Sequence, residues 1–134
     1  MIFLDTSFLV ALEIESDSNH EKAVALGNDI TNDKFGEMII SDYIFDEAVT
    51  ATLWRTKSLE KASVTGTTLR ESCEILKVDE TDIERAWELF KSQKGTKFSF
   101  TDCTNIVVMT KYKITHIATF DEDFTKVKEI KVVQ

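Results

Sequence analysis

Four acidic residues stand where carboxylates could work together: Asp5, Glu47, Asp102 and Asp121, with Asp123 close to the last of them. Asp5 and Asp121 each follow a short apolar run of the kind that predicts a strand, whereas the other two fall in segments with helical spacing. Each acid alone has an ordinary explanation, because Asp is common at helix N-caps, in first helical turns and in tight turns. Their common position relative to the predicted elements indicates a shared site.

Glu47 is the hardest of these acids to explain as an ordinary surface residue. On a helical wheel it lies between Ala51 and Trp54, inside an apolar stripe. A carboxylate there needs a cation, a strong hydrogen-bond donor or a raised pKa. A salt bridge, to Arg55 or to a distant lysine, remains an alternative to a functional role.

Clustered carboxylates favour metal chemistry over an acid–base pair. Like charges at close range repel, so such a cluster needs either a shared proton or a hard cation between its members. Mg²⁺ prefers oxygen ligands and keeps several waters, which leaves room for a substrate phosphate. The sequence has no P-loop, G-x-G-x-x-G or G-x-S-x-G motif, so nucleotide-triphosphatase, dinucleotide-binding and serine-hydrolase functions lack support.

The elements that must position these acids alternate along the chain. Apolar runs predict strands at residues 2–4, 38–41, 75–78, 117–120 and 130–133, and helical patterns fill the intervals. Alternation of this kind predicts an α/β protein with a mainly parallel sheet of about four to five strands, covered by helices on both faces. Right-handed connections place every carboxyl end at one edge of the sheet, so Asp5 and Asp121 should meet there.

Capping signatures set the expected helix starts. The pattern S-x-x-E or T-x-x-E predicts capping boxes at residues 18–21 and 81–84, and the residues expected as caps of three other helices are Asp42, Ser58 and Ser99. Two of the predicted helices have a clear apolar side. In the helix after Ser58, the apolar side consists of Leu59, Ala62, Leu69 and Cys73. In the helix after the second capping box, it consists of Ile83, Ala86, Trp87 and Phe90.

Length and composition predict one ordered domain over residues 1–134. Cys73 and Cys103 lack metal-ligand spacing, so neither a zinc site nor a disulfide framework is expected. Acids interrupt the apolar start of the chain, which argues against a signal peptide and a membrane span. We therefore expect a cytoplasmic protein.

The formal charge of −8 argues at first against a nucleic-acid partner, because Lys and Arg supply most of that affinity. The acidity is regional, however. Residues 1–50 hold eleven acids and two lysines, whereas residues 51–134 hold thirteen acids and fourteen basic residues. An acidic region of this kind either needs a cation or is a solvated surface, and net charge does not separate the two.

Four segments together resemble the motifs of PIN domains, in the same order and over nearly the whole chain. The opening strand with its D-T-S turn is residues 2–7, the glutamate motif is residues 46–48, the third motif is residues 98–102, and a T-x-D-x-D-F element is residues 118–124. Each motif is short, but the ordered set is fairly specific.

The resemblance implies a PIN-like three-layer α/β/α sandwich and a Mg²⁺- or Mn²⁺-dependent ribonuclease, often a VapC-like toxin. Such toxins are usually homodimers that an antitoxin protein blocks. The resemblance implies an acidic quartet of Asp5, Glu47, Asp102 and Asp121, with Asp123 auxiliary. Supporting roles would fall to Thr6 or Ser7 and to Asn105, and contacts to the RNA backbone to Arg55, Lys57 and Lys97.

Two other functions compete with the nuclease. A phosphoacceptor or phosphatase domain also carries acids after its first strand, but a second acid is expected near Asp5, and Thr6 and Ser7 follow instead. A PIN-like module without catalysis, which only binds RNA or a protein, stays open.

Overall fold

A five-stranded parallel sheet forms the centre of the computed structural model, which describes residues 1–134. The strands are β1 (Ile2–Leu4), β2 (Met38–Ser41), β3 (Glu74–Leu76), β4 (His116–Ala118) and β5 (Lys131–Val133). Their order is β3-β2-β1-β4-β5, and every neighbouring pair is parallel. The central strand β1 is wholly buried. The predicted α/β fold with a parallel sheet is confirmed.

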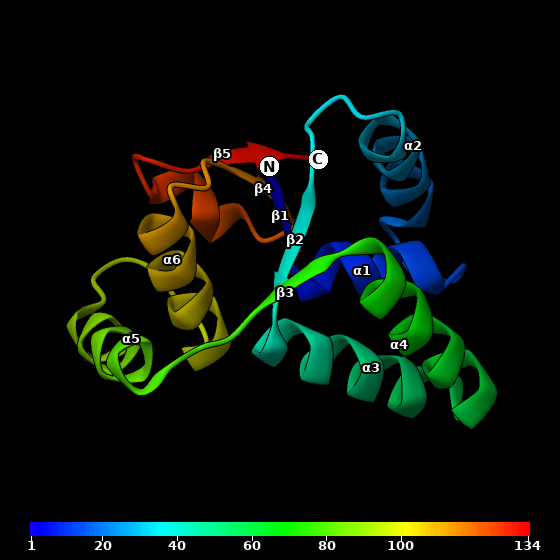
Figure 1. Ribbon diagram of the computed structural model, residues 1–134, viewed down its shortest axis with the longest axis horizontal. Coiled ribbons are helices and arrows are strands. Elements are labelled where there is room, and N and C mark those ends of the chain that lie inside the picture. The colour runs from blue at the N-terminus through cyan, green and yellow to red at the C-terminus, as the bar shows by residue number, and fades with distance from the viewer.

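Helices cover both faces of this sheet, as expected for parallel strands. They are α1 (Thr6–Glu13), α2 (His20–Thr31), α3 (Asp42–Thr56), α4 (Leu59–Ser72), α5 (Glu80–Ser92), α6 (Phe100–Tyr112) and a short 3₁₀ helix, η1 (Glu122–Lys126). In Figure 1, α5 and α6 lie on one side of the sheet and α1, α2 and α4 on the other. None of these helices has the length and apolar character that a membrane crossing requires.

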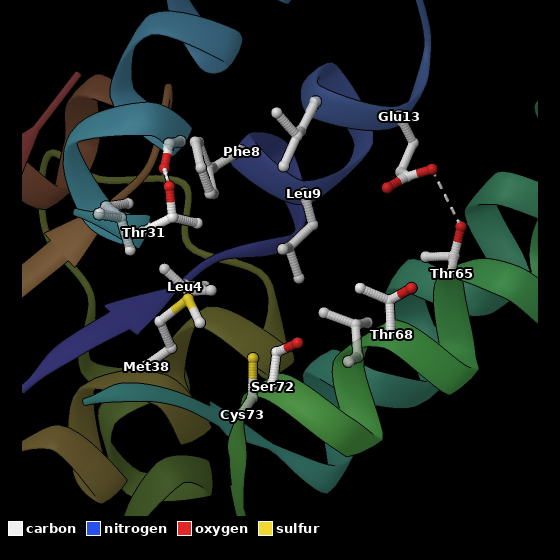
Figure 2. Close-up of a pocket in the computed structure, with 14 residues that line it drawn as sticks. Leu4, Phe8, Leu9, Glu13, Thr31, Met38, Thr65, Thr68, Ser72 and Cys73 are labelled. Carbon is white, nitrogen blue, oxygen red and sulfur yellow. Dashed lines mark hydrogen bonds between the residues drawn. The ribbon is translucent and has the colours of Figure 1, made fainter. Parts of the chain in front are cut away.

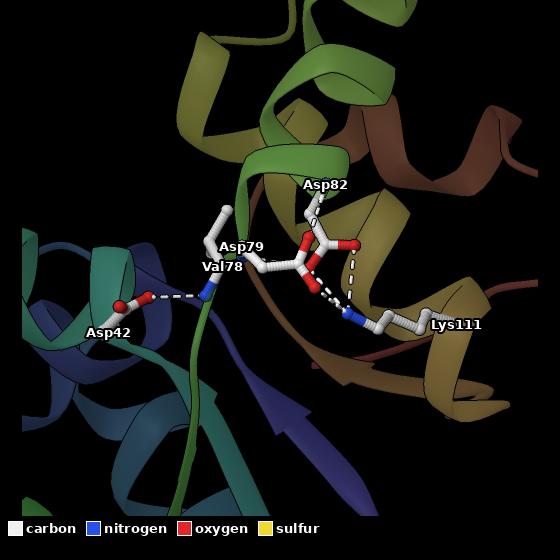
Figure 3. A network of polar contacts seen from close by, with 5 residues as sticks. All are labelled: Asp42, Val78, Asp79, Asp82 and Lys111. Carbon is white, nitrogen blue, oxygen red and sulfur yellow. Dashed lines mark hydrogen bonds and ion pairs between the residues drawn. The ribbon is translucent and has the colours of Figure 1, made fainter.

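The start of α3 differs from the prediction that Asp42 is its cap. Ser41, the last residue of β2, is the N-cap, and its Oγ accepts a hydrogen bond from the backbone N–H of Ile44 at 3.1 Å. An N-cap needs an extended backbone, and a residue that ends a strand already has one. Asp42 is therefore the first helical residue, and its Oδ1 accepts from the backbone N–H of Val78 at 3.0 Å (Figure 3).

Both predicted S/T-x-x-E capping boxes were wrong. The N-cap of α2 is Asn19, with no side-chain cap bond, and the box of α5 joins Asp79 to Asp82. The N-cap of α5 lies two residues before the predicted cap, because an aspartate pair satisfies the first N–H groups earlier. Ser58 and Ser99 do cap α4 and α6, as predicted.

Helices α5 and α6 pack side by side in opposite directions. Lys111, near the end of α6, pairs with Asp79 and Asp82 at the start of α5, at 2.8 and 2.9 Å (Figure 3). At the other end of the pair, the ring of Phe100 at the start of α6 lies beside Trp87 and Phe90. We call the first group the lysine clamp and the second group, Trp87, Phe90 and Phe100, the aromatic cluster.

Some residues of the predicted apolar sides remain exposed. In α5, Ala86 is buried, but Trp87 is 46% and Phe90 36% exposed. In α4, Leu69 is buried and Leu59 is 71% exposed, contrary to the expected inward position. These helices form the outer layers, so nothing in the chain covers the part of the apolar side that extends beyond the neighbouring helix.

Candidate active site

Asp5 lies at the carboxyl edge of the sheet, between the end of β1 and the start of α1, which it caps. It is only 4% exposed. Its Oδ2 accepts hydrogen bonds from Ser7 Oγ at 2.6 Å, from Thr119 Oγ1 at 2.8 Å and from the Ser7 backbone N–H at 3.3 Å. Burial raises the pKa of Asp5 even though these bonds act in the opposite direction. The carboxylate is thus held in a fixed orientation at a cost in desolvation.

The two hydroxyls that hold Asp5 also join the ends of β1 and β4. Ser7 Oγ lies 3.1 Å from Thr119 Oγ1 and accepts from the backbone N–H of Phe120, and Thr119 Oγ1 accepts from the backbone N–H of Asp121. This small network keeps Asp121 next to Asp5. Of the two hydroxyl residues predicted to support the site, Ser7 makes these contacts, whereas the buried Thr6 hydroxyl has no partner.

Thr119 was not predicted as a site residue. It is fully buried, it directly follows β4, and its hydroxyl donates to Asp5. The only sequence signal was its place in the T-x-D-x-D-F element, two residues before Asp121. Its role depends on a contact across 114 residues of chain, which local pattern analysis does not register.

Asp102 sits in the first turn of α6 and takes part in a capping box. Its Oδ2 accepts from the backbone N–H of Ser99 at 2.7 Å, and Ser99 Oγ accepts from the backbone N–H of Asp102. Burial is the main cause that raises its pKa to about 6, and the charges of Asp5 and Asp121 add to it. The predicted capping role and proximity to the other acids are therefore both present.

Glu47 faces the same edge from α3. Its pKa is raised mainly by burial and further by the charges of Asp5 and Asp46. The suggested salt bridge to Arg55 does not form, because Arg55 pairs with Asp17 at 2.9 Å. Glu47 instead lines an open polar cleft of about 420 Å³ together with Thr101 and with Asp42, Tyr43 and Asp46.

Asp121 and Asp123 differ in their surroundings although both belong to the last motif. Asp121 caps η1, and its Oδ1 accepts from the backbone N–H of Asp123 at 2.9 Å. Both oxygens of Asp123 are already engaged, one by Lys126 and one by the backbone N–H of Lys97 at 2.7 Å. These contacts lower the pKa of Asp123. Asp123 thus has a cation of its own, unlike the other four acids.

Asn105 follows Asp102 by one helical turn and is completely buried. Neither its Oδ1 nor its Nδ2 has a hydrogen-bond partner. A buried amide without partners costs about 1–3 kcal/mol. Its position beside the acids makes Asn105 a group that a bound ion or its waters could satisfy.

We call Asp5, Glu47, Asp102 and Asp121 the acidic site. None of the ion pairs in the structure includes one of these residues. The charge of Asp5 acts on Glu47 and on Asp102, and that of Asp121 acts on Asp102. No three acidic, histidine or cysteine side chains lie close enough together to enclose a metal ion. The donor set, carboxylates with an unpartnered amide beside them, fits a hard divalent cation such as Mg²⁺ or Mn²⁺.

The residues expected to contact an RNA backbone do not form one patch. Arg55 forms an ion pair with Asp17, and Lys57 is an exposed residue at the C-cap of α3. Lys97 is exposed, and its backbone binds Asp123 beside the acidic site. Only Lys97 therefore has a contact that links it to the acids.

A separate apolar cavity of about 140 Å³ lies between α1, α2 and α4 (Figure 2). Leu4, Phe8, Leu9 and Met38 contribute to its wall, and a hydrogen bond from Thr65 to Glu13 borders it. No member of the acidic site lines this cavity. The cavity and the acidic site are therefore distinct features of the molecule.

Comparison with known proteins agrees with the geometry. The family model of the PIN domain matches residues 2–130. The chain belongs to the PIN-domain family. It is 30% identical, over 135 residues and 98% of each chain, to the 23S rRNA-specific endonuclease VapC20 of Mycobacterium tuberculosis, in the strains CDC 1551 / Oshkosh and ATCC 25618 / H37Rv.

Three solved structures are similar to this chain. The crystal structure of M. tuberculosis VapC20, described as a Sarcin-Ricin loop cleaving toxin, matches with a TM-score of 0.82 and 28% identity, over 96% of this chain and 95% of that one. VapBC2 from Rickettsia felis matches with a TM-score of 0.72 and 16% identity over 99% and 98%. FitAcB from Neisseria gonorrhoeae matches with 0.64 and 19% over 100% and 97%. The last two comparisons support the fold alone.

Proposed function

We propose that this PIN-domain chain is a Mg²⁺- or Mn²⁺-dependent ribonuclease that hydrolyses RNA phosphodiester bonds at the acidic site. The observation that carries the proposal is a group of neighbouring, partly or fully buried carboxylates without a basic partner, of which Asp5, Glu47 and Asp102 have a raised pKa. Such a group is costly unless a cation joins it. A PIN-like module that only bound RNA would not need a group of buried, unpaired carboxylates that lowers its stability.

The chain's own residues prepare the site for an ion. Ser7 and Thr119 direct their hydroxyls to Oδ2 of Asp5, and Ser99 directs its N–H to Oδ2 of Asp102. In each carboxylate these bonds leave Oδ1 as the oxygen to face a ligand. A bound divalent cation would polarise a phosphoryl oxygen and lower the pKa of a bound water. Above about pH 6 Asp102 is ionised and ready to bind it.

The relatives suggest the substrate class. VapC20 is named for 23S rRNA and for cleavage of the Sarcin-Ricin loop. We propose that this chain also cleaves a ribosomal RNA loop in the cytoplasm and acts as a toxin that an antitoxin protein blocks. We further propose that it is a homodimer, which a mass measurement on the purified protein tests directly.

The test of the nuclease is cleavage of an end-labelled rRNA stem-loop with Mg²⁺, with Mn²⁺ and with EDTA. We expect cleavage by the wild type with either metal and a loss of about 100-fold or more in Asp5→Asn. The matched control is Asp17→Asn, which removes an acid paired with Arg55 away from the site and should cleave normally. Metal-independent cleavage, or full activity in Asp5→Asn, contradicts the proposal.

A further inference from the structure

The aromatic cluster is an unusual surface for the outer face of a helix pair. The rings of Trp87 and Phe90 stack, with centroids 5.7 Å apart and planes 13° from parallel. Phe100 meets both of them edge-on, at 6.4 and 6.3 Å. Trp87 and Phe90 remain 46% and 36% exposed. The cluster is thus a preformed set of ring faces and edges that is open to solvent.

The fold places this cluster beside the acidic site. Phe100 and Asp102 belong to the same first turn of α6. At about 100° per residue they point to opposite sides of the helix, Phe100 toward α5 and Asp102 toward Asp5. The rings and the acids are therefore separated by about one helix diameter, ~10 Å. A strand that crosses the start of α6 would contact both.

The charge around the cluster suits a polyanion. Lys91 Nζ lies 5.7 Å from the centroid of the Trp87 ring and is paired with Glu88 Oε1 at 2.7 Å. Lys94 and Lys97 are in none of the ion pairs of the structure. The segment 91–97, which leads from α5 to α6, has three lysines and no acid, in a chain with a net charge of −8. Lys91, Lys94 and Lys97 are all exposed. This basic segment runs from the rings to the backbone contact of Lys97 with Asp123.

We propose that the aromatic cluster stacks an unpaired base of the RNA substrate, while Lys94 and Lys97 of segment 91–97 contact its backbone. Base–aromatic stacking combined with a basic path is the common way in which proteins hold unpaired RNA. The proposal rests on the proposed ribonuclease function and names a part of its substrate site. It requires an RNA with unpaired nucleotides, such as a loop.

Binding can be measured without cleavage, in EDTA, because the chain has only two tryptophans. In a Trp54→Phe background Trp87 is the sole reporter, and an RNA stem-loop with an unpaired loop should quench its fluorescence. In a Trp87→Phe background the remaining Trp54, 76% exposed on α3, should not respond. A fully paired duplex of the same composition should leave Trp87 unquenched, because its bases are not available for stacking.

Affinity for the same stem-loop provides the second measurement. Trp87→Ala should weaken binding by about tenfold, the size of one lost base–aromatic stack, and Trp87→Phe should restore most of it. Trp54→Ala, which removes an equally large exposed ring, is the matched control and should bind as the wild type does. Each variant is checked for its mass in solution and its circular dichroism spectrum.

Three results would overturn the proposal: no quenching of Trp87, unchanged affinity in Trp87→Ala, or a loss of affinity that accompanies a change from dimer to monomer. The last result would assign the cluster to contact with a second copy of the chain. Failure of the nuclease is distinguishable, because wild type would then quench and bind in EDTA but not cleave with metal. Failure of the cluster alone would leave metal-dependent cleavage intact in Trp87→Ala.

Discussion

Two groups of acids in this protein each contain one almost fully buried aspartate, and the two aspartates differ in whether the chain supplies a cation to them. Asp82 in the lysine clamp is 1% exposed, and Asp5 in the acidic site is 4% exposed. In the clamp, Lys111 lies 2.8 and 2.9 Å from the two aspartates. The acidic site has no cation from the chain at all.

The pKa shifts follow this difference. Lys111 lowers the pKa of Asp79, and the two aspartates raise the pKa of Lys111. In the acidic site, burial raises the pKa of Asp5, and burial together with repulsion from neighbouring acids raises the pKa of Glu47 and Asp102. The buried acid that is paired with a lysine links two helices. The buried acid without a basic partner is available to bind a cation from solution.

The largest expected effect is on the response to metal. Saturating Mg²⁺ or Mn²⁺ should raise the melting temperature of the wild type by roughly 10 °C, since a ligand at 100 times its Kd stabilises by about 2.7 kcal/mol. Asp5→Asn should abolish this shift, because it removes the most buried carboxylate of the acidic site. Thermal unfolding with metal and with EDTA measures both.

The corresponding change in the lysine clamp should leave the response to metal intact. Asp82→Asn removes an equally buried charge, but its carboxylate is already paired with Lys111 and should not be a metal ligand. We therefore expect the full metal shift in this variant. If Asp82→Asn lost the shift and Asp5→Asn kept it, the assignment of the two groups would be reversed.

A smaller effect is expected on stability when the clamp loses its cation. Lys111→Met should lower the melting temperature by roughly half of the metal shift, because it leaves the carboxylate of Asp82 buried and unpaired. Adding Asp82→Asn to Lys111→Met should recover part of the loss. Unfolding followed by circular dichroism tests this, and cleavage measured on the same samples should remain close to wild type. A clamp variant that has the melting temperature of the wild type but does not cleave RNA would show that the lysine clamp takes part in cleavage.

The smallest expected effect is the slope of stability with pH. Asp102 has a folded pKa of about 6, above the ordinary 3.8, so the folded state keeps a proton that the unfolded chain releases. Without metal, its contribution to stability is full below about pH 3.8 and is lost as the pH rises to about 6. For Asp79, whose pKa is lowered, the contribution is present above about pH 3.8 and is lost as the pH falls. In EDTA, the difference in melting temperature between wild type and Asp102→Asn should therefore shift against the wild type between about pH 4 and 6, and a flat difference contradicts the raised pKa.

Local patterns were sufficient for the sheet and for most helices. Short apolar runs and 3.6-residue spacing are set by neighbouring residues, so they predicted all five strands within one or two positions. They failed at helix starts. Asp42, Ser18 and Thr81 have side chains suited to an N-cap, but in α3 and α5 the cap is the residue with an extended backbone, Ser41 and Asp79 respectively. The cap of α2 is Asn19, whose backbone is not extended and whose side chain makes no cap bond.

The sequence by itself determined the fold class and the acids that share the carboxyl edge, because parallel topology brings residues that follow strands to one side. Only the tertiary structure decided which acids have partners. In the structure, Asp123 forms an ion pair with Lys126 and Arg55 forms one with Asp17, and the hydroxyl of Thr119 donates a hydrogen bond to Asp5. It also left Trp87 and Phe90 uncovered. Partner choice depends on distances between residues far apart in the chain, and a linear pattern of residue types does not contain those distances.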